Sequence, residues 1–135
     1  MNEAQIPARY FLVLPAAGSG RRMQAGLPKQ YLELAGRSLL QHSLERLGAL
    51  PEIAGIVVAL AADDARWPQI HAALPKEVAV KVSTVIGGAE RMQSVANALD
   101  ALQPQANAHD WVLVHDAVRP CVHPADVRKL MQETA

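Results

Sequence analysis

The chain has 135 residues, the length of one domain, and half of them are hydrophobic, which is enough for a core. Thirteen basic and thirteen acidic residues give a formal net charge of zero, so no global basic field favours nucleic acid. The only cysteine, Cys121, excludes an internal disulfide and disfavours a cysteine-based zinc site. Residues 1–9 lack a signal-peptide layout and no apolar run reaches membrane-spanning length, so we expect a cytoplasmic protein that binds no membrane.

Four short apolar runs predict β-strands, and helical patterns separate them. The predicted strands are Tyr10–Leu14, Ile56–Leu60, Val80–Ile86 and Trp111–His115. The first predicted helix is Ser38–Leu50, and the second is capped by Asp63-Asp64, has Pro68 near its start and reaches Leu74. The third is Arg91–Leu102, whose inward residues are Val95, Ala98, Leu99 and Leu102. A last helix begins at His123-Pro124.

Strands that are apolar throughout and alternate with helices predict a mostly parallel sheet with helices on both faces. Right-handed crossovers then give a doubly wound, Rossmann-like α/β fold. We expect the first strand to lie between the second and the fourth. A ligand would bind beyond the carboxyl ends of the strands, where the strand order reverses. The loop from Pro15 and the segment His115–Pro120 would face each other across that crevice.

The loop after the first strand carries the strongest signal. It reads Pro15-Ala16-Ala17-Gly18-Ser19-Gly20-Arg21-Arg22-Met23, and Pro28-Lys29-Gln30 follows. Small residues let backbone N–H groups approach an anion closely, and the cations add positive charge, so the loop indicates a polyphosphate site. Met23 replaces the third glycine of a dinucleotide fingerprint, and the P-loop pattern is absent. The two glycines alone also fit a plain tight turn, but such a turn needs no cluster of cations.

Asp116 stands directly after the fourth predicted strand, at the predicted crevice. A carboxylate beside bound phosphates is a good Mg²⁺ ligand, although an aspartate there also fits a turn or a helix cap. Arg119 could bind a second anionic group or pair with Asp116. We interpret His115 and Cys121 as structural residues, and both tryptophans as packing residues.

A second glycine motif, Gly87-Gly88-Ala89-Glu90-Arg91-Met92-Gln93-Ser94, joins the third strand to its helix at the same edge of the sheet. Its backbone could read the edge of a base, and Ser94 could add a hydrogen bond. Taken alone, the motif also fits a glycine turn that starts a helix. No nucleophile–base pair stands out, and what remains is the charge stabilisation that nucleotidyl transfer needs.

Together these segments resemble the 2-C-methyl-D-erythritol 4-phosphate cytidylyltransferases, nucleotidyltransferases of isoprenoid precursor synthesis. The matching pieces are Pro15–Met23, Pro28-Lys29-Gln30-Tyr31-Leu32, Gly87–Arg91 with Ser94, and Val112-Leu113-Val114-His115-Asp116-Ala117-Val118-Arg119-Pro120-Cys121. The first piece is shared across the nucleotidyltransferase superfamily. Its combination with the run around Asp116 is much more specific.

The resemblance implies transfer of CMP from CTP to methylerythritol phosphate, with release of pyrophosphate. It also implies that Arg22 and Lys29 are catalytic and stabilise charge on the α-phosphate, while Asp116 holds Mg²⁺ and Ala117 and Arg119 lie on the acceptor side. In the same way it implies that cytosine is contacted by Gly88, Ser94 and the backbone of Ala89. The ribose and phosphates of CTP would be held by the backbone of Pro15, Ala16, Ala17, Gly18, Ser19 and Gly20. Ala89 departs from the polar or acidic residue that is common in relatives.

The resemblance also implies a homodimer formed through an arm that lies beyond Ala135. We therefore interpret residues 1–135 as the nucleotide-binding part of a single α/β nucleotidyltransferase domain, truncated at its C-terminal side. We expect this form to lack the arm-mediated dimer and to need the missing part for activity. Two alternatives stay open: a nucleotidyltransferase for another alcohol phosphate, such as ribitol 5-phosphate, and a non-catalytic nucleotide-binding fragment.

Overall fold

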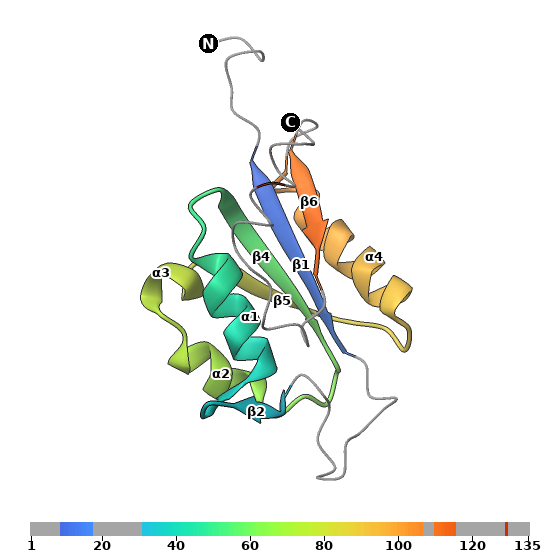
Figure 1. Cartoon of the computed structure of the whole chain (residues 1–135). Coiled ribbons are helices and arrows are strands. Elements are labelled where there is room, and N and C mark those ends of the chain that lie inside the picture. The colour runs from blue at the N-terminus through green and yellow to red at the C-terminus, as the bar shows by residue number, and fades with distance from the viewer. Residues whose placement is uncertain (1–8, 18–30, 107–109, 116–128, 130–135) are drawn as a thin grey trace.

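A parallel β-sheet forms the centre of the molecule (Figure 1). The computed structural model describes residues 9–17, 31–106, 110–115 and 129. Within them the sheet has four strands in the order β5-β4-β1-β6: β1 (Tyr10–Ala16), β4 (Ile53–Leu60), β5 (Val82–Ile86) and β6 (Trp111–Val114). All three strand pairings are parallel, so the predicted doubly wound α/β class is confirmed, with β1 between β4 and β6.

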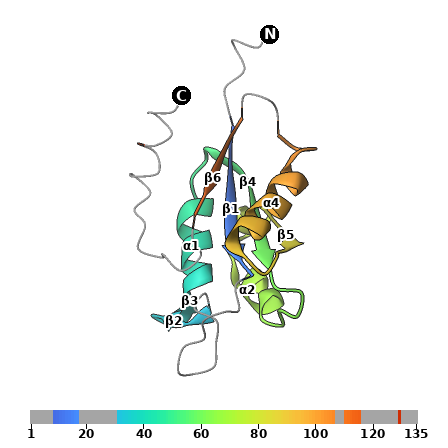
Figure 2. The ribbon, with the colours of Figure 1, turned by 90° about the vertical axis from the view of Figure 1, so that its right-hand side faces the viewer.

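Helices cover both faces of this sheet (Figure 2). The helix α1 (Leu39–Gly48) lies on one face with α2 (Trp67–Ala73) and α3 (Lys76–Ala79), and α4 (Arg91–Leu102) lies on the other. Alternate residues of β1 serve the two layers: Leu12 and Leu14 join the α1 side of the core, whereas Phe11 and Val13 pack with α4. Burial on both faces explains why β1 is apolar throughout.

The α1 helix begins where the sequence predicts. Ser38 is its N-cap, and the Ser38 Oγ accepts a 3.1 Å hydrogen bond from the Gln41 backbone N–H. Leu40, Leu44 and Leu47 follow at helical spacing and are fully buried against the sheet. The apolar stripe therefore fixes which face of α1 meets β1 and β4.

A short hairpin before α1 is absent from the sequence prediction. It pairs β2 (Glu33–Leu34) with β3 (Arg37–Ser38) in antiparallel register. Ala35 and Gly36 form its two-residue turn with φ values of 56° and 82°. Positive φ at both turn residues matches the right-handed twist of a hairpin, and Gly36 was the only part of the usual turn signal present, because alanine is uncommon at such a position.

The α2 helix begins later than its predicted cap. Asp64 lies before α2, and its Oδ1 accepts hydrogen bonds from the backbone N–H groups of Arg66, at 2.9 Å, and Trp67, at 3.0 Å. Pro68 stands in the first turn, where its missing N–H costs nothing. The N-cap of α2 is Arg66, with no side-chain cap hydrogen bond, so the predicted cap at Asp63-Asp64 was wrong, although Asp64 bonds to the chain that enters the helix. The position of Pro68 near the helix start is confirmed.

Several predicted boundaries and faces were wrong. The strand β4 begins at Ile53, ahead of the predicted Ile56, while β5 begins only at Val82 because Val80 ends α3 and is exposed. Leu99 was predicted to face inward but is 40% exposed, because Ser94, Ala98 and Leu102 form the buried stripe of α4. Trp111 packs only in part, at the edge of the sheet.

In the part of the chain described, no helix is long and apolar enough to span a membrane.

Candidate functional site at the carboxyl edge of the sheet

The predicted site residues divide into those that the structure describes and those outside it. Pro15 and Ala16 end β1, Ala17 follows, and Gly88, Ala89 and Ser94 lie at the start of α4. The remainder lie outside the described residues: Gly18, Ser19, Gly20, Arg22, Lys29, Asp116, Ala117 and Arg119. The described set belongs to the nucleotide side of the predicted site.

Two predicted motifs meet at Gly87. A Cβ atom placed on Gly87 would lie 2.5 Å from both the Ala17 Cβ and the Ser94 Oγ, a distance that real side chains do not tolerate. The Gly87 N–H also donates a 2.8 Å hydrogen bond to the Leu60 carbonyl at the end of β4. Glycine is therefore required where the beginning of the first loop, β4 and α4 converge.

Ser94 holds the turn between β5 and α4. Its residue is 2% exposed, and its Oγ accepts a 3.1 Å hydrogen bond from the Gly88 N–H. The structure thus gives Ser94 a bond to the turn itself, and contact of its hydroxyl with a base stays a prediction.

Two further side chains of α4 hold the same turn and were missed by sequence reasoning. Gln93 Oε1 accepts a 3.2 Å hydrogen bond from the Ala89 N–H, and Asn97 Nδ2 donates at 3.0 Å to the Ile86 carbonyl. Polar residues within two turns after a Gly-Gly pair were the available signal. Their partners are backbone atoms, which a sequence pattern does not reveal.

The strand β6 ends beside β1, directly before the segment predicted to form the second half of the crevice. Val114 pairs with Val13, and the His115 N–H donates a 3.0 Å hydrogen bond to the Val13 carbonyl. The His115 backbone therefore continues the ladder, and the structural role of its side chain stays a prediction. The predicted metal ligand, Asp116, is the next residue in sequence and lies outside the described part.

The described residues hold no group of three or more histidine, cysteine or carboxylate side chains that could bind a metal. The predicted magnesium ligand, Asp116, lies outside these residues, so a magnesium site stays a prediction.

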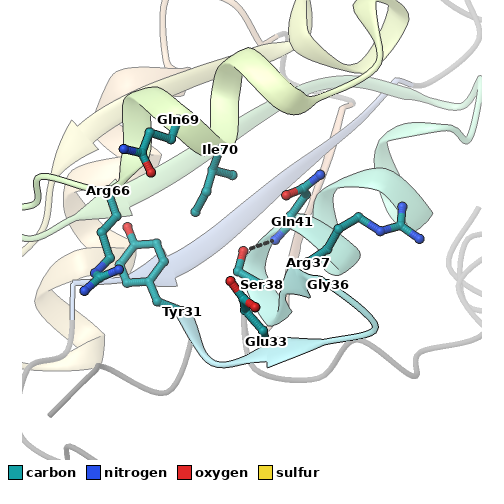
Figure 3. Close-up of a pocket in the computed structure, with 9 residues that line it drawn as sticks. All are labelled: Tyr31, Glu33, Gly36, Arg37, Ser38, Gln41, Arg66, Gln69 and Ile70. Atoms are coloured by element: carbon teal, nitrogen blue, oxygen red, sulfur yellow. Dashed lines mark hydrogen bonds between the residues drawn. The ribbon is translucent and has the colours of Figure 1, made fainter. Parts of the chain in front are cut away.

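A cavity of about 160 Å³ opens on the α1 and α2 side (Figure 3). It lies between the β2–β3 hairpin and the first turns of α1 and α2, and its lining residues are Tyr31, Glu33, Gly36, Arg37, Ser38, Gln41, Arg66, Gln69 and Ile70. The Arg66 guanidinium lies 6.0 Å from the centre of the Tyr31 ring. Burial and a hydrogen bond to Asp64 raise the pKa of the Tyr31 phenol above its usual value.

A family model described as 2-C-methyl-D-erythritol 4-phosphate cytidylyltransferase matches residues 10–135. The chain belongs to this family. It is 53% identical over 127 residues to the cytidylyltransferase of Halorhodospira halophila, a match that covers 93% of this chain and 52% of that protein. It is 48% identical over 131 residues to the Pseudomonas putida (strain GB-1) protein, covering 96% and 54%. This member of the cytidylyltransferase family thus spans about half the length of the curated relatives it matches.

Solved structures of the cytidylyltransferase family share the fold. The Francisella tularensis protein superposes with a TM-score of 0.74 at 31% identity, covering 94% of this chain and 52% of that one. A 4-diphosphocytidyl-2C-methyl-D-erythritol synthase superposes with a TM-score of 0.78 over 95% and 55%, and at 24% identity it supports the fold alone.

Proposed function

We propose that this chain is the nucleotide-binding part of an enzyme that transfers CMP from CTP to 2-C-methyl-D-erythritol 4-phosphate, in the cytoplasm and for isoprenoid precursor synthesis. Membership of the cytidylyltransferase family supports the reaction. The single structural observation that supports the site is the convergence of Ala17, Gly87 and Ser94 at the carboxyl edge of the sheet. That edge is where ligands bind in doubly wound folds.

The proposed reaction needs no nucleophile from the protein. A phosphate oxygen of the acceptor attacks the α-phosphorus of CTP, the bond from that phosphorus to the bridging oxygen breaks, and pyrophosphate leaves. Arg22 and Lys29 are the proposed catalytic residues, because fixed cations stabilise the charge that builds on the α-phosphate.

The other proposed roles follow the two motifs. Backbone groups of Pro15–Gly20 hold the ribose and phosphates, and Gly88, Ala89 and Ser94 hold the cytosine. Asp116 would hold Mg²⁺ together with phosphate oxygens and water, and the metal would neutralise phosphate charge. Ala117 and Arg119 would face the acceptor. The complete protein would act as a homodimer.

The test uses a chain that spans the full length of its relatives, with CTP, Mg²⁺ and the acceptor. We expect pyrophosphate release with methylerythritol phosphate. Release with ribitol 5-phosphate in its place would assign a different acceptor. Calorimetric titration of the 135-residue chain with CTP and Mg²⁺ asks whether this part binds the nucleotide alone. Binding of CTP by the full-length chain without release of pyrophosphate would instead indicate a non-catalytic nucleotide-binding module.

A further inference from the structure

The turn between β5 and α4 is held by successive side chains from the start of α4. Ser94 accepts from the Gly88 N–H at 3.1 Å, and Gln93 accepts from the Ala89 N–H at 3.2 Å. Two neighbouring backbone donors are thus bonded to two neighbouring side chains. The bond from the Ala89 N–H to Gln93 orients the Gly88–Ala89 peptide, and the bond from the Gly88 N–H to Ser94 orients the preceding Gly87–Gly88 peptide.

Gln93 reaches its partner by folding back over Gly88. A Cβ atom on Gly88 would lie 2.1 Å from the Gln93 Oε1 and 2.3 Å from its Cγ and Cδ. The space that a side chain at position 88 would occupy is therefore filled by Gln93. Glycine at 88 and glutamine at 93 form one packing unit, although Gln93 itself is exposed to solvent.

Residue 89 is an alanine, so its side chain has no polar group that could contact a base. An alanine offers a base only its backbone, so the orientation of the Gly88–Ala89 peptide decides which polar groups face the nucleotide. Among the described residues, the side chain recorded as bonded to the Ala89 N–H is that of Gln93.

We propose that Gln93 is a positioning residue for nucleotide selection, which holds the Gly88–Ala89 peptide in the orientation that reads the cytosine of CTP. The inference rests on the proposed function. A purely structural role also exists for a glutamine in the first turn of a helix, where its side chain caps a backbone N–H. The two roles differ in what they change: a cap contributes to stability alone, whereas a positioning residue sets the affinity for CTP.

The experiment compares Gln93→Ala with Gln93→Glu in the full-length protein. Loss of one hydrogen bond predicts that Gln93→Ala raises the KM for CTP about 2- to 10-fold at unchanged kcat. Gln93→Glu keeps an acceptor oxygen at the same reach and restores most of the affinity. The matched control is Met92→Ala, because Met92 is the adjacent residue and is 78% exposed. We expect it to leave both constants unchanged.

Amide hydrogen exchange separates this inference from the proposed function. Gln93→Ala should speed exchange at Ala89 in the protein without nucleotide, whether or not CTP is its substrate. Unchanged exchange at Ala89, or a KM for CTP equal to that of the wild type, would overturn the positioning role. A fall in thermal stability with no change in KM would assign Gln93 as a helix cap. Faster Ala89 exchange in a full-length variant of a protein that does not use CTP would overturn the proposed function and the role in reading cytosine, while the Gln93 hydrogen bond to the Ala89 N–H would stand.

Discussion

The Tyr31 hydroxyl donates a hydrogen bond to the Asp64 Oδ2, and this bond joins the segment that enters the β2–β3 hairpin to the start of α2. Tyr31 is 5% exposed. The other carboxylate oxygen of Asp64 accepts from the backbone N–H groups of Arg66 and Trp67. One carboxylate thus anchors two segments that are 33 residues apart in sequence.

Breaking this anchor should reveal coupling between its two residues. We expect Tyr31→Phe to lower the free energy of unfolding by about 1.5–3 kcal/mol, the range for hydrogen bonds to charged groups. Asp64→Ala should cost more, because it also removes the acceptor for Arg66 and Trp67 at the start of α2. Urea unfolding of both variants and the double variant gives the coupling energy. Strictly additive losses would contradict the anchor.

Alkaline pH should weaken the fold through Tyr31. Burial, followed by the Asp64 hydrogen bond and charge, raises the pKa of this phenol in the folded state. The unfolded chain then loses the phenolic proton first, so the free energy of unfolding falls as the pH rises through the ordinary tyrosine pKa of about 10. Tyr31→Phe removes this contribution. Unfolding by urea on both sides of that pH checks it, and parallel losses in the two proteins would refute it.

Replacement of Arg22 or Lys29 by alanine tests the proposed chemistry. In the full-length protein we expect kcat to fall roughly 10²- to 10³-fold, the scale for loss of one charge-stabilising group, with a much smaller change in the KM for CTP. Arg21→Ala is the control, because Arg21 is the adjacent cation without a proposed role. Steady-state kinetics of pyrophosphate release measures all three variants. A change in the KM for CTP alone would assign Arg22 and Lys29 to nucleotide binding and not to catalysis.

Ser94→Ala should loosen the nucleotide turn. The change removes the Ser94 acceptor of the part-buried Gly88 N–H, which costs about 0.5–1.5 kcal/mol of stability. We also expect the KM for CTP to rise. Asn97→Ala is the comparison, because Asn97 bonds to the Ile86 carbonyl before the two glycines and should affect stability alone. Equal changes in KM for the two variants would argue against a specific role of Ser94.

The core makes a contrasting pair of predictions on leucines. Leu44 lies on the buried face of α1, so Leu44→Ala should cost about 2–5 kcal/mol of unfolding free energy. Leu99 is 40% exposed on α4, and Leu99→Ala should change the free energy of unfolding by roughly 0.5 kcal/mol or less. Chemical denaturation compares the two. Similar losses would mean that Leu99 is buried after all.

The sequence predicted the strand order well because β1 and β4 are apolar throughout, a pattern that only a sheet covered on both faces explains. It did not predict the β2–β3 hairpin. There the signal is two residues with positive φ, and Ala35 is an unusual residue for that conformation. Leu99 was placed inward because helical spacing alone allows it. In the structure Ser94, Ala98 and Leu102 form the buried stripe of α4, and Leu99 lies beside it.

The candidate site was predictable where residue type carries the chemistry. Glycine at 87 and 88 allows the close approach of Ala17, Ser94 and Gln93, and Ser94 bonds to the Gly88 N–H, whereas contact of these residues with a base stays a prediction. The role of Gln93 was not predictable, because its exposed side chain folds back to accept a hydrogen bond from the Ala89 N–H, and no sequence pattern indicates that contact. The proposed roles of Lys29 and Asp116 stay predictions from sequence, because both residues lie outside the described part.

The central place of β1 has a consequence for the order of folding. The Arg9 guanidinium bonds to the Asp110 carboxylate at 3.0 Å, across a separation of 101 residues, as Tyr10 pairs with Trp111. Closing so long a loop is slow, whereas β4 follows β1 after one hairpin and one helix. During synthesis, β1 therefore emerges from the ribosome long before β6 does. Until β6 has been synthesised, one edge of the apolar strand β1 is unpaired, and at this stage the nascent chain is most exposed to misassociation.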